Sequence, residues 1–160
     1  MPHVAFVSFS GLRVREAETL ALGMSLPGLR ARTDAIAQLP PLGLLTLAGM
    51  TPDQWTCSLH EADGDAGLVE QVLAERPTLA AVSALTASIE EAYRFSDDLR
   101  RYRIPVVLGG LHVTACPQEA QSHADAVVVG EGEPVWHSVL ADAKSGNLAP
   151  QYHSSEPFDL

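Results

Sequence analysis

Basic residues are scarce in this chain of 160 residues. Ten lysines and arginines stand against twenty aspartates and glutamates, so the formal net charge is −10 at pH 7. Nucleic-acid binding depends on lysine and arginine side chains that neutralise phosphates, and the sequence contains no basic cluster of that kind. We therefore expect no nucleic-acid partner and interpret the acidic excess as a solvated surface.

Cysteines and long apolar stretches are also few. Cys57 and Cys116 lie far apart, without the spacing of a disulfide framework or a metal site, which indicates free thiols in a reducing compartment. No apolar stretch nears the roughly 18 residues that a membrane-spanning helix needs, and the start of the chain lacks the features of a secretory signal. We therefore expect a cytoplasmic location and no membrane span.

Two common nucleotide-binding motifs are missing as well. No G-x-G-x-x-G follows the first apolar run, and no Gly-Lys-Ser/Thr occurs anywhere in the chain. Dinucleotides and nucleoside triphosphates are thus disfavoured ligands. A flavin or another phosphate-bearing ligand stays open, because Ser8 and Ser10 place hydroxyl groups at the end of the first run.

What is present is a regular alternation of short β-branched runs with segments of helical periodicity. Such alternation predicts an α/β fold with a parallel sheet, right-handed crossovers and helices on both faces. We expect a Rossmann-like domain of five strands in the flavodoxin-like order 2-1-3-4-5, with a ligand crevice between the first and third strands. The expected strands are residues 3–10, 56–61, 78–84, 104–108 and 125–129, and the expected helices are residues 42–50, 67–76, 88–103, 117–123 and 134–144.

This pattern accounts for one domain over residues 1–148. Residues 11–40 interrupt it, and a connection of this length is too long to be passive, so we expect an irregular insertion or lid there. Residues 149–160 are polar and contain proline, which is typical of a linker.

Glycines mark the ends of two predicted strands, in the runs at residues 106–110 and 127–133. The carboxyl ends of parallel strands share one edge of the sheet, where ligands of open α/β folds bind. Glycine there lets the backbone approach a ligand closely. Ser83 and Thr86, after the third strand, add hydroxyl groups to the same edge. A wide planar or nucleotide-bearing ligand would suit it.

The spacing of these residues resembles the cobalamin (vitamin B12)-binding domain. That family carries D-x-H-x-x-G before the first helix, S-x-L after the third strand and G-G after the fourth. Here Ser83-Ala84-Leu85 matches S-x-L, Gly109-Gly110 matches G-G, and Gly43 takes the place of the glycine in the first motif. The resemblance covers nearly the whole chain and implies a slot for cobalamin with its dimethylbenzimidazole tail detached.

The first motif departs from the general pattern. Gln38 stands where the family has aspartate, and Pro40 stands where it has the cobalt-ligating histidine. Proline cannot coordinate cobalt, so the resemblance implies a base-off, His-off cofactor. The N-terminal domain of cobalamin-dependent radical S-adenosylmethionine (SAM) enzymes often lacks this histidine, and it resembles this chain in Pro-Leu-Gly-Leu, Gly-Gly-x-His and the run at residues 124–133.

The resemblance implies a set of cofactor-binding residues at the strand ends and at the start of the first helix. It implies no catalytic residue and no metal ligand in this chain, and a lone histidine such as His112 more often packs or hydrogen-bonds than coordinates a metal. The implied set is Pro40, Pro41, Leu42, Gly43, Ser83, Leu85, Thr86, Gly109, Gly110, Leu111, His112, Gly130, Glu131, Gly132 and Glu133.

Each piece of this set also has a purely structural interpretation. Gly109 and Gly110 fit a tight turn, Ser83 and Thr86 fit caps of the following helix, and the acidic pair of residues 131 and 133 fits a helix N-terminus.

The implied function is that of a cobalamin-binding module in a radical SAM methyltransferase or related enzyme. SAM and a [4Fe–4S] cluster would belong to a catalytic domain outside this sequence, joined in cis or in trans, because neither cysteine lies in a C-x-x-x-C-x-x-C motif. The chain would then be an excised domain or a truncated relative. Two alternatives stay open: a degenerate domain that serves as a scaffold or interaction surface, and a flavodoxin-like binder of flavin or another phosphate-bearing ligand.

Overall fold

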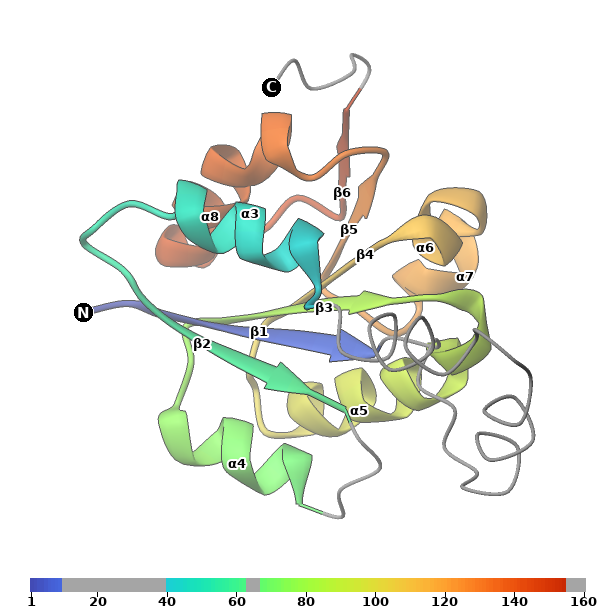
Figure 1. The fold of residues 1–160 in the computed structure, drawn as a ribbon, viewed down its shortest axis with the longest axis horizontal. Helices are drawn as coiled ribbons and strands as arrows, with labels where there is room; N and C mark the ends of the chain where they lie inside the picture. Colours follow the sequence, from blue (N-terminus) through green and yellow to red (C-terminus); the bar gives the residue numbers. More distant parts are fainter. Residues whose placement is uncertain (10–39, 63–66, 155–160) are drawn as a thin grey trace, which may run out of the picture.

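The sheet is parallel throughout and has helices on both faces (Figure 1). The computed structural model describes residues 1–9, 40–62 and 67–154. Its strands are β1 (His3–Phe9), β2 (Thr56–Glu61), β3 (Leu79–Ala84), β4 (Val106–Gly109), β5 (Ala126–Val129) and β6 (Gln151–His153), in the spatial order β2-β1-β3-β4-β5-β6. Its helices are α3 (Leu42–Met50), α4 (Leu68–Glu75), α5 (Ile89–Arg101), α6 (Leu111–Ala115), α7 (Pro117–Gln121) and α8 (Trp136–Ser145), with 3₁₀ turns η1 (Thr86–Ser88) and η2 (Glu133–Val135).

Strand alternation divides the core into two clusters. Along β1, Val4 and Phe6 face α3 and α8, whereas Ala5 and Val7 face α4 and α5. All four side chains are essentially buried, which is why residues 4–7 are apolar on both faces of the strand. Each fully buried valine or phenylalanine contributes about 1.5–3 kcal/mol, so the central strands provide much of the stability.

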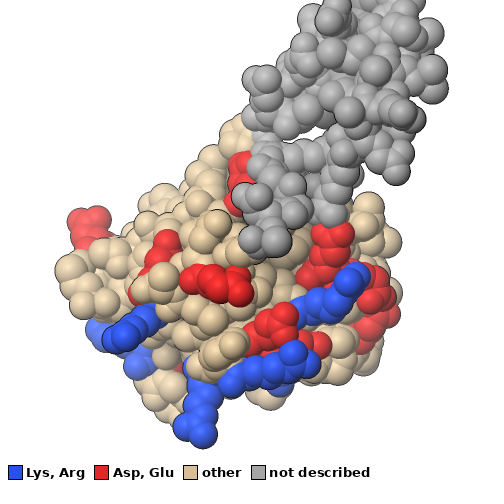
Figure 2. Space-filling model, turned by 90° about the horizontal axis from the view of Figure 1, so that it is seen from below, with Lys and Arg blue, Asp and Glu red and all other residues tan. Residues whose placement is uncertain are grey.

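Helix α5 shows how a surface helix is positioned. Its apolar stripe is buried against the sheet, while acidic residues occupy its first turn and Arg100 and Arg101 its last, as the helix dipole favours. Arg100 contacts Asp97 at 3.7 Å and Asp125 at 3.4 Å. On the face shown in Figure 2, basic side chains lie beside acidic ones. The charged residues of α5 therefore form its solvated face, as the sequence pattern predicts.

The predicted fold class and strand order are confirmed, but the predicted number of strands is one too low. Strand β6 lies within the segment predicted to be a linker and pairs with β5 in parallel register. Only Tyr152 of β6 is buried, and its hydroxyl donates a hydrogen bond to Asp142 Oδ2 at 2.7 Å and accepts one from the Ala149 amide at 3.0 Å. A three-residue edge strand with one apolar side chain has too short a pattern to be recognised from sequence.

One further difference concerns a local element. Helix α6 was not predicted, because its five residues span little more than one turn and, unlike α7, it does not begin with a proline. The expected insertion at residues 11–40 lies outside the described residues except for Pro40. No helix in the described part of the chain is long and apolar enough to span a membrane.

Candidate functional site

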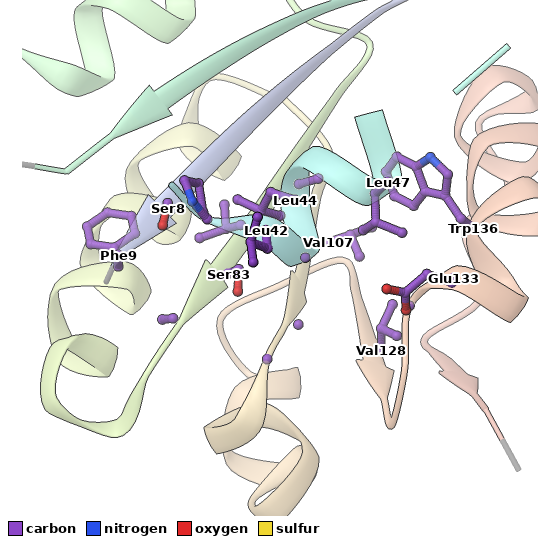
Figure 3. A pocket seen from close by; sticks show the side chains of 18 of the residues that line it. Ser8, Phe9, Leu42, Leu44, Leu47, Ser83, Val107, Val128, Glu133 and Trp136 are labelled. Carbon is purple, nitrogen blue, oxygen red and sulfur yellow. The ribbon is translucent and has the colours of Figure 1, made fainter. Parts of the chain in front are cut away.

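A cavity of about 330 Å³ opens at the carboxyl ends of the central strands, beneath α3 (Figure 3). Strands β1, β3, β4 and β5 contribute to its walls, and α3, the loop after β5 and α8 close it on the other side. It therefore extends across four strands, rather than lying only in the predicted crevice between the first and third strands. The size falls in the range of small-molecule pockets.

The lining of the cavity is mostly apolar. Helix α3 contributes Leu44 and Leu47, the strands contribute Val107, and Trp136 lies at the start of α8 (Figure 3). The polar side chains are few and separated, and they belong to Ser8, Ser83 and Glu133. An apolar pocket with a few spaced polar groups suits a large, mostly apolar ligand that is oriented by a small number of hydrogen bonds.

Trp136 anchors the wall that α3 forms. Its ring is 1% exposed and packs on Phe6 with centroids 5.5 Å apart. Its Nε1 donates a hydrogen bond to Thr51 Oγ1 at 2.9 Å, and Thr51 in turn donates to the Leu47 carbonyl at 2.8 Å. These two hydrogen bonds thus connect the end of α3 to α8, and the position of α3 over the cavity depends on this connection.

The two glycines at the end of β4, Gly109 and Gly110, have different structural requirements. Gly110 has φ +111°, and a Cβ there would lie 2.8 Å from the Ala84 carbonyl oxygen, so the backbone itself requires glycine. Among the described residues, a Cβ at Gly109 would meet only Val128 Cβ, at 3.8 Å, which is an ordinary contact. The protein therefore tolerates a side chain at Gly109, but that side chain would project into the cavity that this residue lines.

Gly43, in the first turn of α3, also has space around it for a side chain, as Gly109 does. A Cβ built there has no atom of the described residues within 4 Å, and the residue lines the cavity. Its neighbour Leu42 also lines the cavity and is 67% exposed, although leucine is normally buried. The start of α3 thus presents an apolar, uncrowded surface at the mouth of the cavity.

Ten of the fifteen residues in the predicted set line the cavity. They are Pro41, Leu42, Gly43, Ser83, Leu85, Gly109, Gly110, Gly130, Gly132 and Glu133. The other five, which are not among the lining residues, are Pro40, Thr86, Leu111, His112 and Glu131.

Those five residues lie elsewhere around the strand ends. Pro40 and Glu131 are exposed, and Leu111 is 76% exposed at the start of α6. Thr86 and His112 contact each other, with 3.2 Å between Thr86 Oγ1 and His112 Nδ1. The hydroxyl of Thr86 therefore does not cap α5, which has no side-chain cap.

The predicted set omitted the deeper wall of the cavity. Leu44 and Leu47 of α3 line it together with Trp136, which lies at the start of α8. The i, i+3 spacing of Leu44 and Leu47 on an apolar helix was the one available signal. Core residues and pocket residues show the same spacing, so this signal does not distinguish them. Ser8 and Phe9 were expected at this edge of the sheet, and they do line the cavity.

Comparison with known proteins explains this arrangement. The family model of the B12 binding domain matches residues 32–140, which is more than half of the chain. The chain belongs to the B12-binding domain family. The matched region of this B12-binding domain runs from before α3 into α8 and therefore includes most of the cavity wall.

Curated relatives of this B12-binding domain include three methyltransferases. It is 33% identical over 123 residues to bacteriochlorophyllide d C-8(2)-methyltransferase of Chlorobaculum tepidum, covering 72% of this chain and 24% of the relative. It is 28% identical to bacteriochlorophyllide d C-12(1)-methyltransferase of the same organism, covering 76% and 26%. An uncharacterized methyltransferase of Synechocystis is also 28% identical, with 76% and 23% covered. The aligned region spans about a quarter of each relative. No solved structure gives a significant match.

Proposed function

We propose that this chain binds cobalamin in the base-off, His-off form and serves as the cofactor module of a methyltransferase. The observation that carries the proposal is the open position at Gly109, where glycine leaves space in the cavity that the protein does not need for its own packing. When bound, cobalamin supplies a transferable methyl group. The cofactor's detached tail would lie between β3 and β4, with Ser83 as a hydrogen-bond partner.

The residues of the cavity fit such a ligand. Ser83 is half-buried and lies opposite Gly109 in the register of β3 and β4. Gly110 brings the chain against the Ala84 carbonyl and turns it away from the slot. The apolar wall of Leu44 and Leu47 excludes water from the inner end of the slot. The exposed Leu42 would cover part of the lower face of the corrin ring.

The cavity supports a cofactor without a protein cobalt ligand. None of the described residues that line it is a histidine. His112, the histidine nearest in sequence to the G-G pair, directs one ring nitrogen to Thr86 and the other to Glu119, at 3.2 Å each. Pro40, in the position of the ligating histidine of the general family, has no side-chain group that binds metals. The role of this chain is therefore to hold and orient the cofactor.

The enzyme to which this module belongs would be a radical SAM methyltransferase. The relatives that are named methyltransferases are about four times longer than the aligned region, which leaves room for a catalytic domain. SAM and the [4Fe–4S] cluster would be bound there, because this sequence has no C-x-x-x-C-x-x-C motif.

Reconstitution tests the proposal directly. Hydroxocobalamin is added to the purified chain, free corrinoid is removed by desalting, and the visible spectrum is recorded. We expect retained corrinoid, a spectrum that Pro40→Ala does not change, and no nitrogen coupling from a lower ligand in the electron paramagnetic resonance spectrum of the Co(II) form. Failure to retain corrinoid, both in this chain and in a protein that includes a catalytic domain, would overturn it.

The same experiment separates the two alternatives. A folded chain that never retains corrinoid would be a scaffold that has lost its cofactor. Uptake of flavin, with its own visible absorbance, would support the flavodoxin-like alternative. The phosphate-binding loop of such a protein would follow β1, within residues that lie outside the described part of the chain.

A further inference from the structure

Three residues with metal-binding side chains meet on α6 and α7, outside the cavity. They are His112, Cys116 and Glu119, and their ligand atoms all lie within 4.8 Å of one another. The closest pair is His112 Nε2 and Glu119 Oε1, 3.2 Å apart. Imidazole, thiolate and carboxylate are the three ligand types that zinc uses in proteins.

The local fold brings these side chains together. His112 and Cys116 are one helical turn apart, and the Cys116 amide donates a hydrogen bond to the His112 carbonyl at 2.8 Å. Pro117 follows at once and starts α7, whose first turn contains Glu119. The spacing H-x-x-x-C-x-x-E is thus folded into a cluster by the break between two short helices.

Two neighbouring residues position the imidazole of His112. Thr86 lies 3.2 Å from His112 Nδ1, so the hydroxyl can accept the Nδ1 proton and leave Nε2 with a free lone pair toward the cluster. Tyr93 is 4% exposed and packs edge-to-face against the His112 ring, with ring centroids 6.4 Å apart.

We propose that His112, Cys116 and Glu119 form a site for a zinc-like divalent cation, with a water molecule as the fourth ligand. In a tetrahedral site with bonds of about 2.0–2.3 Å, neighbouring ligand atoms are about 3.2–3.7 Å apart. The 3.2 Å between His112 Nε2 and Glu119 Oε1 already meets this condition. The sulfur of the half-buried Cys116 lies within 4.8 Å of both partner atoms and would move closer to them when the cation binds.

Two observations favour a cation over a simple His–Glu ion pair. An ion pair does not require a thiol beside it, yet Cys116 places its sulfur within reach of both partners. Nor does an ion pair require that Thr86 orient the second imidazole nitrogen, which is the usual arrangement around a metal-bound histidine.

Co²⁺ is the probe that tests the site, because it takes zinc positions and is coloured. Metal-free, corrinoid-free chain is titrated with CoCl₂ and its absorbance is recorded. We expect one equivalent to bind, with a thiolate-to-cobalt charge-transfer band and the strong visible bands of four-coordinate Co²⁺, all removed by excess Zn²⁺. Cys116→Ser should lose the charge-transfer band, and Thr86→Val should weaken binding about tenfold as the loss of a residue that orients a ligand.

Cys57 supplies the matched control, since it is the other cysteine of the chain and lies exposed on β2. Cys57→Ser should leave the Co²⁺ spectrum unchanged. In the unmodified chain, Zn²⁺ should slow alkylation of Cys116 by iodoacetamide and leave that of Cys57 unaffected, which tests the site without any substitution. The proposal is overturned if no charge-transfer band develops, if the band survives Cys116→Ser, or if Zn²⁺ does not protect Cys116.

Discussion

Adding one methyl group at either of two adjacent glycines should have opposite consequences. At Gly110 the new Cβ would lie 2.8 Å from the Ala84 carbonyl oxygen, in a backbone conformation with φ +111°. At Gly109 it would find only Val128 Cβ, at 3.8 Å, and would otherwise project into the cavity. We therefore expect Gly110→Ala to impair the fold and Gly109→Ala to impair ligand binding.

The two effects differ in size as well as in kind. Strain at a positive φ costs on the order of 1–3 kcal/mol, and the carbonyl contact adds to it. For a domain of this size each kcal/mol lowers Tm by about 2–4 °C, so Gly110→Ala should lower Tm by at least about 2 °C. Gly109→Ala should leave stability unchanged or raise it by about 0.4–1 kcal/mol, because alanine has a smaller unfolded-state entropy.

Cobalamin binding should show the opposite pattern, because Gly109→Ala changes the cavity and not the stability of the fold. A methyl group in the place of a ligand atom costs about 1–3 kcal/mol, by analogy with an overpacked core. Gly109→Ala should then weaken cobalamin binding about 5- to 150-fold. Thermal unfolding by circular dichroism measures the first effect, and a hydroxocobalamin titration followed by visible absorbance measures the second. A stable Gly109→Ala chain that binds cobalamin as tightly as the unmodified chain would refute the argument, and so would a Gly110→Ala chain with unchanged Tm.

Two further predictions concern buried side chains whose hydrogen bonds stabilise the fold. Trp136→Phe removes the hydrogen bond to Thr51 and should lower the free energy of unfolding by about 1–3 kcal/mol in urea titrations; a loss below about 0.5 kcal/mol would contradict its role as the anchor of α3. Burial and the Asp142 carboxylate raise the pKa of Tyr152 to about 12, above its ordinary value of 10.0. The unfolded chain releases this proton first, so stability should fall as pH rises from 10 to 12, and Tyr152→Phe should remove that part of the fall.

The central part of the fold could be predicted because its local patterns are strong. Mostly apolar runs identified β1, β3, β4 and β5, and glycines identified the ends of β4 and β5. Pro41 before α3 and Gly146 after α8, with φ +73°, mark helix ends for which those residue types are typical. Each of these signals reflects the conformation of only a few neighbouring residues, and the local sequence largely determines that conformation.

The depth of the cavity could not be predicted, because it depends on how one helix lies against the sheet. Leu47 and Trp136 form its inner wall through tertiary contacts that leave no local pattern. The same holds for His112, which was expected beside the cofactor. His112 is not among the residues that line the cavity, and its Nε2 lies 3.2 Å from Glu119 Oε1.

Strand β6 has a consequence for anything attached after it. Because it runs parallel to β5, its last residue points to the same edge of the sheet as the cavity. The Ser154 amide donates a hydrogen bond to the Val129 carbonyl at 3.0 Å, and the Ser154 carbonyl oxygen would lie 3.0 Å from a Cβ at Gly130, a residue of the cavity lining. The polypeptide therefore leaves the sheet beside the opening of the cavity, so a neighbour tethered there would begin at that opening without a long connection around the domain.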